Sequence, residues 1–90
     1  MTKDQIYKIR DNLGLTQEQF GQLLGVHPMT VSKWERQGDP SKPNEYQMEM
    51  MKKFGEAAKD DAAKKVGTVL IAAGAVAAIF LLLSLVMKKK

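Results

Sequence analysis

Cysteine is absent from the 90 residues of this sequence, and His27 is the single histidine. Without cysteine the chain has no disulfide scaffold and no thiolate metal site, and one histidine cannot build a metal cluster or a proton relay. A nucleophile–base pair, a metal-ligand spacing and a phosphate-binding loop are also missing. We therefore expect the protein not to be an enzyme and to need no metal and no cofactor.

An excess of one charge sign is missing from the first 56 residues. Eight cations stand against eight anions there, namely Lys3, Lys8, Arg10, Lys33, Arg36, Lys42, Lys52 and Lys53 against Asp4, Asp11, Glu18, Glu35, Asp39, Glu45, Glu49 and Glu56. The net charge of +4 comes from the rest of the chain, where residues 57–65 add one positive charge and Lys88, Lys89 and Lys90 add three. The sequence pI of about 9.4 therefore does not indicate a nucleic-acid-binding surface.

Charge is missing altogether from residues 66–87, the 22-residue run VGTVLIAAGAVAAIFLLLSLVM. A helix of that length spans about 33 Å, enough for a hydrocarbon core of about 30 Å. The alternative is a buried helix of a soluble protein, but the rest of the chain is too small to cover such a helix on every face. The sequence therefore predicts a transmembrane helix over 66–87. A charged, alanine-rich and helical linker (57–65) precedes it, and a basic tail (88–90) follows it.

The lysines on either side of this segment predict its orientation. Five lysines lie close to its N-terminal side and three follow it, and no signal sequence precedes the N-terminal domain. We therefore expect a single-pass protein of the cytoplasmic (inner) membrane, in contact with membrane lipid, with its N-terminal domain in the cytoplasm. The small residues Gly67, Gly74 and Ala78 can form a close-packing face, so a homodimer through the transmembrane helix is a further hypothesis.

Helix-capping signals divide the N-terminal part into short helices. Thr2 and Thr16 are each followed three residues later by glutamine, the pattern of a capping box, and predict helices over about 2–12 and 17–24. Gly25 can adopt the left-handed conformation that ends the second helix.

A third helix and a fourth follow. Pro28 suits the first position of the third, which Gly38 ends, and the fourth covers about 44–54. Because a turn of about three residues centred on glycine joins the second and third helices, the arrangement is that of a helix-turn-helix. The predicted fold class is all-α, a four- to five-helix helix-turn-helix domain (1–56) followed by a single transmembrane helix.

The run LTQEQFGQLLGVHPMTVSKWER at 15–36 resembles the Cro/C1-type (XRE) helix-turn-helix family, and the resemblance covers roughly residues 4–54. From spacing, Gly21 allows close helix packing. The resemblance implies that Arg10 pairs with Glu35. The residues of the structural motif are Arg10, Phe20, Gly21, Leu24, Gly25, Val26, Val31, Trp34 and Glu35.

The resemblance also implies that the third helix enters the major groove of DNA and that Gln17 contacts a phosphate. The implied DNA-contacting residues are Gln17, His27, Met29, Thr30, Ser32, Lys33 and Arg36. Lys33 can donate to guanine or phosphate, and Met29 can touch a thymine methyl group. His27 has a second interpretation as a helix cap, because serine often occupies its position in the family.

Three functions follow from these patterns. The first is a membrane-anchored DNA-binding protein that regulates transcription or tethers DNA to the membrane. The second is a RodZ-like membrane adaptor whose helix-turn-helix binds a cytoskeletal or other protein, which the neutral N-terminal part favours. The third is a virion or phage assembly protein, because residues 55–90 faintly resemble filamentous-phage coat proteins. The positions of Gln17 and Lys33 favour the first.

Overall fold

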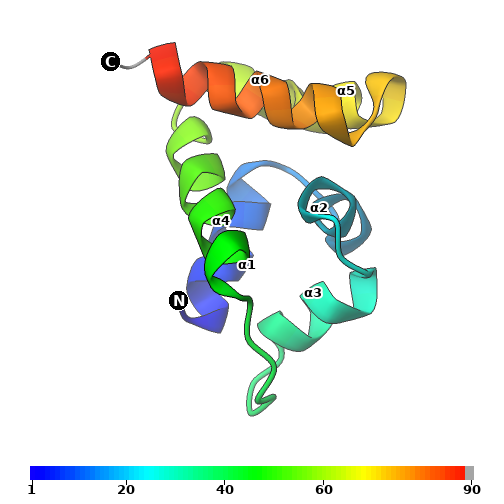
Figure 1. Cartoon of the computed structure of the whole chain (residues 1–90), viewed down its shortest axis with the longest axis vertical. Coiled ribbons are helices and arrows are strands. Elements are labelled where there is room, and N and C mark those ends of the chain that lie inside the picture. Colours follow the sequence, from blue (N-terminus) through cyan, green and yellow to red (C-terminus); the bar gives the residue numbers. More distant parts are fainter. Residues whose placement is uncertain (89–90) are drawn as a thin grey trace.

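The computed structural model describes residues 1–88, which are helical apart from short connections (Figure 1). The elements are α1 (Lys3–Asn12), α2 (Gln17–Leu24), α3 (Pro28–Glu35), α4 (Glu45–Ala57), the 3-10 helix η1 (Asp61–Lys65), α5 (Val66–Ala73) and α6 (Ala75–Lys88). The last two lysines of the predicted basic tail lie outside the described residues.

Local sequence signals set the helix starts. The Thr2 side chain accepts a hydrogen bond from the backbone N–H of Gln5, and the Gln5 side chain accepts one from the backbone N–H of Thr2. The same reciprocal pair forms between Thr16 and Gln19. Both predicted capping boxes are therefore confirmed, since each satisfies two backbone donors that a helix start leaves without a partner.

The boundaries of the later helices differ from prediction. The third helix ends at Glu35, and Gly38 lies in the following turn with a φ of 82°. The fourth runs to Ala57, three residues beyond the predicted Phe54. A backbone turn at 58–60 and the 3-10 helix η1 then occupy the segment predicted to be a helical linker.

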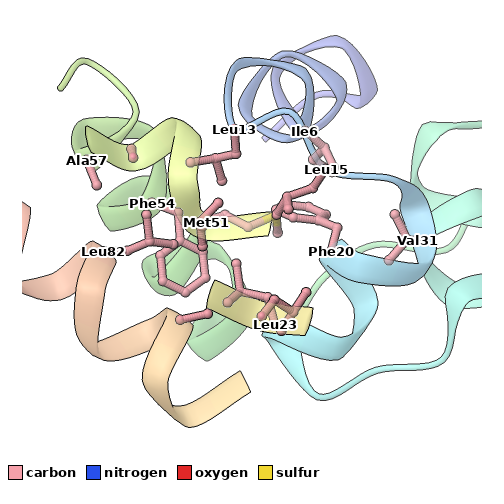
Figure 2. Packing of buried hydrophobic residues seen from close by; sticks show 14 of the residues in the cluster. Ile6, Leu13, Leu15, Phe20, Leu23, Val31, Met51, Phe54, Ala57 and Leu82 are labelled. Atoms are coloured by element: carbon pink, nitrogen blue, oxygen red, sulfur yellow. The ribbon is translucent and has the colours of Figure 1, made fainter. Parts of the chain in front are cut away.

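One hydrophobic core runs through the molecule. Phe20 and Val31 fill it from the side of α2 and α3, and Met51 and Phe54 fill it from α4 (Figure 2). Leu82 of α6 is also fully buried in this cluster. The C-terminal helices therefore form part of the core of the described chain.

The predicted transmembrane helix is wrong. The chain breaks at Gly74, whose φ of 93° and ψ of 176° are far from helical values. Two helices of 8 and 14 residues result, packed against each other as the hairpin α5–α6. Within residues 1–88, no helix combines the length and the apolar character that crossing a membrane requires. This finding overturns the expected single-pass location and orientation as well.

Packing explains why so apolar a segment folds back. Val66 and Leu70 of α5 and Leu82 of α6 are buried against the N-terminal helices, and α6 contacts both α2 and α4. The assumption that the chain is too small to cover this segment fails, because the two halves partly cover each other and one face of α6 stays exposed.

The three small residues predicted to pack two membrane helices together have other positions in this fold. Ala78 is fully buried in the core, and Gly74 makes the hairpin turn. Gly67 approaches Leu15 in the connection between α1 and α2, because a Cβ built on Gly67 would lie 3.6 Å from the Leu15 side chain.

Candidate nucleic-acid interface

The turn between α2 and α3 brings these two helices into close contact (Figure 1). A Cβ built on Gly21 would lie 2.7 Å from the Val26 carbonyl oxygen, so only glycine fits there. Gly25 ends α2 with a φ of 73°, a left-handed conformation that glycine adopts without steric cost. The angle at which α3 leaves α2 is therefore set by two glycines.

The start of α3 is capped by a histidine. The Nδ1 atom of His27 accepts a hydrogen bond of 3.0 Å from the backbone N–H of Met29. Pro28 follows as the first residue of the helix, where its missing N–H leaves no donor without a partner. His27 therefore has a structural role as a helix cap, and its exposed ring also lies beside the N-terminal turn of α3.

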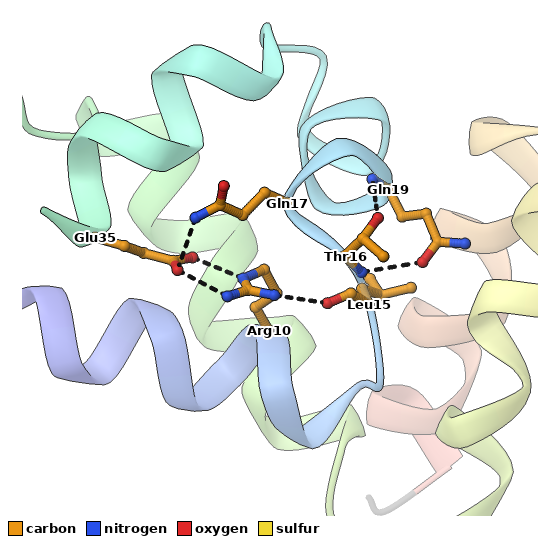
Figure 3. Close-up of polar contacts among 6 residues, drawn as sticks. All are labelled: Arg10, Leu15, Thr16, Gln17, Gln19 and Glu35. Atoms are coloured by element: carbon orange, nitrogen blue, oxygen red, sulfur yellow. Dashed lines mark hydrogen bonds and ion pairs between the residues drawn. The ribbon is translucent and has the colours of Figure 1, made fainter.

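A polar network ties α3 to α1 and α2 (Figure 3). The Arg10 guanidinium donates from Nε and Nη2 to the two carboxylate oxygens of Glu35, each at 2.8 Å, and from Nη1 to the Leu15 carbonyl oxygen at 2.9 Å. The Arg10 and Glu35 side chains are only 15 % and 9 % exposed. The hydrogen bonds to Glu35 raise the pKa of Arg10 above its ordinary value, so the guanidinium stays protonated.

Gln17 belongs to the same network. Its Nε2 atom donates to Glu35 Oε1 at 3.2 Å, which holds the side chain at the N-terminus of α2 (Figure 3). A primary amide carries two N–H donors, and the bond to Glu35 uses one of them. The other donor remains for a second acceptor.

The outward face of α3 carries the side chains predicted to contact DNA. Met29, Lys33 and Arg36 are exposed, and Thr30 and Ser32 are half-buried beside them. The opposite side of α3 faces the core, because Val31 and Trp34 are buried there. Phe20 is buried as well, while Leu24 and Val26 are partly buried against the core.

Sequence analysis missed a group of cations next to the end of α3. Lys3 and Lys42 line the same surface groove as Arg36. Asp39 lies 3.9 Å from Arg36, and its hydrogen bond with the Ser41 backbone lowers the pKa of this carboxyl. Lys3 begins α1, whereas Arg36 and Lys42 lie in the loop between α3 and α4, so no local pattern in the sequence brings all three together.

Comparison with protein families agrees with this geometry. Residues 6–44 match the model of a helix-turn-helix family. This segment is similar to that family, and we call it the helix-turn-helix domain. The match contains the run 15–36 and confirms the resemblance to the Cro/C1-type family for this part of the chain. No curated protein and no solved structure matches the chain.

The helix-turn-helix domain thus accounts for α2, α3 and most of α1, and the C-terminal hairpin lies outside the match. In the structure Gln17 stands at the start of α2 and the remaining six candidate contacts stand on or next to α3. Helix α3 lies farther from the hairpin than α2 does (Figure 1).

Proposed function

We propose that this protein binds DNA through its helix-turn-helix domain and acts as a transcription regulator. The observation that carries the proposal is the exposed face of α3, held by the Arg10–Glu35–Gln17 network at a fixed angle to α2. A short, well-anchored helix with an exposed polar face suits the major groove, which admits one α-helix.

Two kinds of contact follow from the positions of the side chains. Gln17 and the N-terminal N–H groups of α2 can donate to a phosphate, which sets the position of the domain on the duplex. Lys33 and Ser32, one turn into α3, can reach base edges, and Met29 can contact a thymine methyl group. Arg36, with Lys3 and Lys42 beside it, supplies phosphate contacts at the other end of the helix.

The charge balance sets the expected strength of binding. Because residues 1–56 carry equal numbers of cations and anions, few phosphates are neutralised and binding by one domain is weak. For Z phosphate contacts the affinity falls with salt with a slope of roughly −0.9Z on logarithmic axes. We therefore expect a shallow salt dependence, of about three or four contacts, rather than the steep one of strongly basic regulators.

The test is selection of bound duplexes from a randomised DNA library by the full chain, followed by titration of the selected sequence. Lys33→Ala should change the selected sequence, and Gln17→Ala should weaken binding to all sequences by about 5- to 30-fold, the loss of one charge-assisted contact. Lys53→Ala and Gln22→Ala are the matched controls, because both residues are exposed and are not among the predicted contacts.

A chain that enriches no sequence, and whose weak binding is equally affected by Lys33→Ala and Lys53→Ala, would overturn the proposal. The helix-turn-helix domain would then have a different partner, such as another protein.

A further inference from the structure

The outer face of α6 carries a second row of apolar side chains. Val76, Phe80, Leu83 and Met87 follow one another at intervals of four, three and four residues. Val76, Phe80 and Met87 are 83 %, 74 % and 73 % exposed. Such intervals are those of a helix that packs along a second helix in a coiled-coil-like seam.

This outer row lies opposite the row that packs into the core. The inward residues of α6 are Ala78, Leu82 and Leu85, all buried. At roughly 100° per residue, the two rows lie on opposite sides of the helix. A helix that is apolar on both sides is normally covered on both sides, and within residues 1–88 only the inner one is covered.

We infer that a second copy of this chain covers the outer face of α6, with the two α6 helices antiparallel about a two-fold axis. In this arrangement Val76 lies opposite Met87 of the partner copy, and Phe80 lies opposite its Leu83. The same four residues fill both sides of the contact, as an isologous interface requires. Phe80, Leu83 and Met87 already line a shallow groove with Ser84, into which the partner's ring can insert.

Charge selects the antiparallel direction. The hairpin has its cations at one end, where Lys65 precedes α5 and Lys88 ends α6, and its uncharged turn at Gly74 at the other. A parallel pair would place the lysines of both copies together. The antiparallel pair places each lysine end beside the uncharged turn of the other copy, which avoids this repulsion.

The exposed apolar seam runs along α6. Val76, Phe80 and Met87 present three large side chains without an intervening charge. Monomeric proteins rarely expose contiguous apolar patches beyond a few hundred Å². A standard interface buries about 800 Å² on each partner, so a seam along one helix of 14 residues makes a small interface. We therefore expect a weak dimer that forms in the micromolar range.

The dimer has a consequence for DNA that rests on the proposed function. The hairpin α5–α6 and helix α3 lie toward opposite ends of the molecule's long axis (Figure 1). A two-fold axis through the outer face of α6 therefore points the two α3 helices away from each other. Such a dimer bridges two separate DNA duplexes, whereas a dimer that reads adjacent half-sites needs both α3 helices on one side.

Disulfide trapping tests the interface directly, because the wild-type chain contains no cysteine. Full-length Val76→Cys and Met87→Cys chains are mixed and oxidised. The mixed disulfide should form readily, while each variant alone should remain uncrosslinked, since identical positions lie about 16 Å apart along an antiparallel pair. Disulfides in each variant alone, or in no sample, would overturn the inference.

Sedimentation of the uncrosslinked chain provides the second measurement. Wild type should sediment as a dimer, Phe80→Glu as a folded monomer with unchanged helical circular dichroism, and Tyr46→Glu as a dimer. Tyr46 is the matched control because it is a 69 % exposed aromatic residue of α4. A wild-type chain that is monomeric at high micromolar concentration would overturn the inference.

Bridging is measured separately from binding. Two differently labelled duplexes should be recovered together with wild type and not with Phe80→Glu, although Phe80→Glu still binds single duplexes. If the chain dimerises and forms the mixed disulfide but binds no DNA, the proposed function is refuted while the inferred dimer stands.

Discussion

Arg10 and Glu35 illustrate how one partly buried ion pair holds a helix in position. Glu35 accepts hydrogen bonds from Arg10 and Gln17, so its carboxylate joins α1, α2 and the end of α3. Arg10→Met removes the cation and leaves a carboxylate that is 9 % exposed without its main partner. We expect the free energy of unfolding to fall by about 3 kcal/mol, measured by urea denaturation.

The double variant Arg10→Met, Glu35→Leu separates the stabilisation that the ion pair provides from the destabilisation caused by an unpaired Glu35 carboxylate. It should recover at least half of the lost stability, because no partly buried charge remains without a partner. A double variant less stable than Arg10→Met alone would show that Glu35 stabilises the fold through other contacts.

Gly21 and Gly55 are both helical glycines, but their surroundings differ. A Cβ on Gly21 would meet a backbone oxygen at 2.7 Å, whereas one on Gly55 would meet the Ile9 side chain at 3.3 Å, which can move. Gly21→Ala should therefore destabilise the protein by about 1–3 kcal/mol, through overpacking at the α2–α3 turn. Gly55→Ala should change stability little or raise it by up to about 1 kcal/mol, because alanine favours a helix. Thermal unfolding of the two variants gives the comparison, and equal losses would contradict it.

At the scale of elements, the hairpin α5–α6 forms one wall of the core. Leu82 is fully buried in the same cluster as Phe54 and Met51 of α4. Leu82→Ala should therefore destabilise the whole molecule by about 2–4 kcal/mol. Fluorescence of Trp34, the single tryptophan, reports this loss from within the helix-turn-helix domain. Ile71→Ala, at a 79 % exposed position of the same hairpin, should cost less than about 0.5 kcal/mol.

If the unfolding midpoint measured by Trp34 fluorescence were the same in Leu82→Ala as in wild type, the hairpin would not stabilise the helix-turn-helix domain.

The elements differ in how far sequence predicts them. The starts of α1 and α2 follow from threonine–glutamine pairs three residues apart, a signal contained within one helical turn. The break at Gly74 depends on burial of Leu70 and Leu82 against helices far away in sequence. Hydropathy over residues 66–87 cannot distinguish that burial from immersion in lipid, because both remove the same side chains from water.

The candidate DNA surface shows the same division. The pairing of Arg10 with Glu35 was implied by family resemblance, and the outward position of Lys33 followed from the buried positions of Val31 and Trp34 around it. The groove shared by Lys3, Arg36 and Lys42 could not be predicted, because the fold of the loop after α3 decides which of these cations meet.

At the scale of the whole molecule, the core is continuous from the helix-turn-helix domain to the hairpin. The fully buried Phe20 and Leu23 of α2 and Leu82 of α6 belong to one hydrophobic cluster (Figure 2). A small domain has little buried surface to spare, so we expect loss of the hairpin to destabilise α1 to α4 strongly. The stability of residues 6–44 should therefore depend on the hairpin.

This continuity predicts one cooperative unfolding transition. Trp34 fluorescence follows the core between α3 and α1, while far-ultraviolet circular dichroism follows all helices, the hairpin included. In the Phe80→Glu chain, which we expect to be a monomer whose stability does not depend on concentration, both signals should give the same urea midpoint and the same dependence of the unfolding free energy on urea. If helical signal from 66–88 were lost at lower urea than the Trp34 signal, the hairpin would be a separate unit. Leu82→Ala would then lower the urea midpoint measured by circular dichroism alone. A shared core requires the midpoints from circular dichroism and Trp34 fluorescence to fall together.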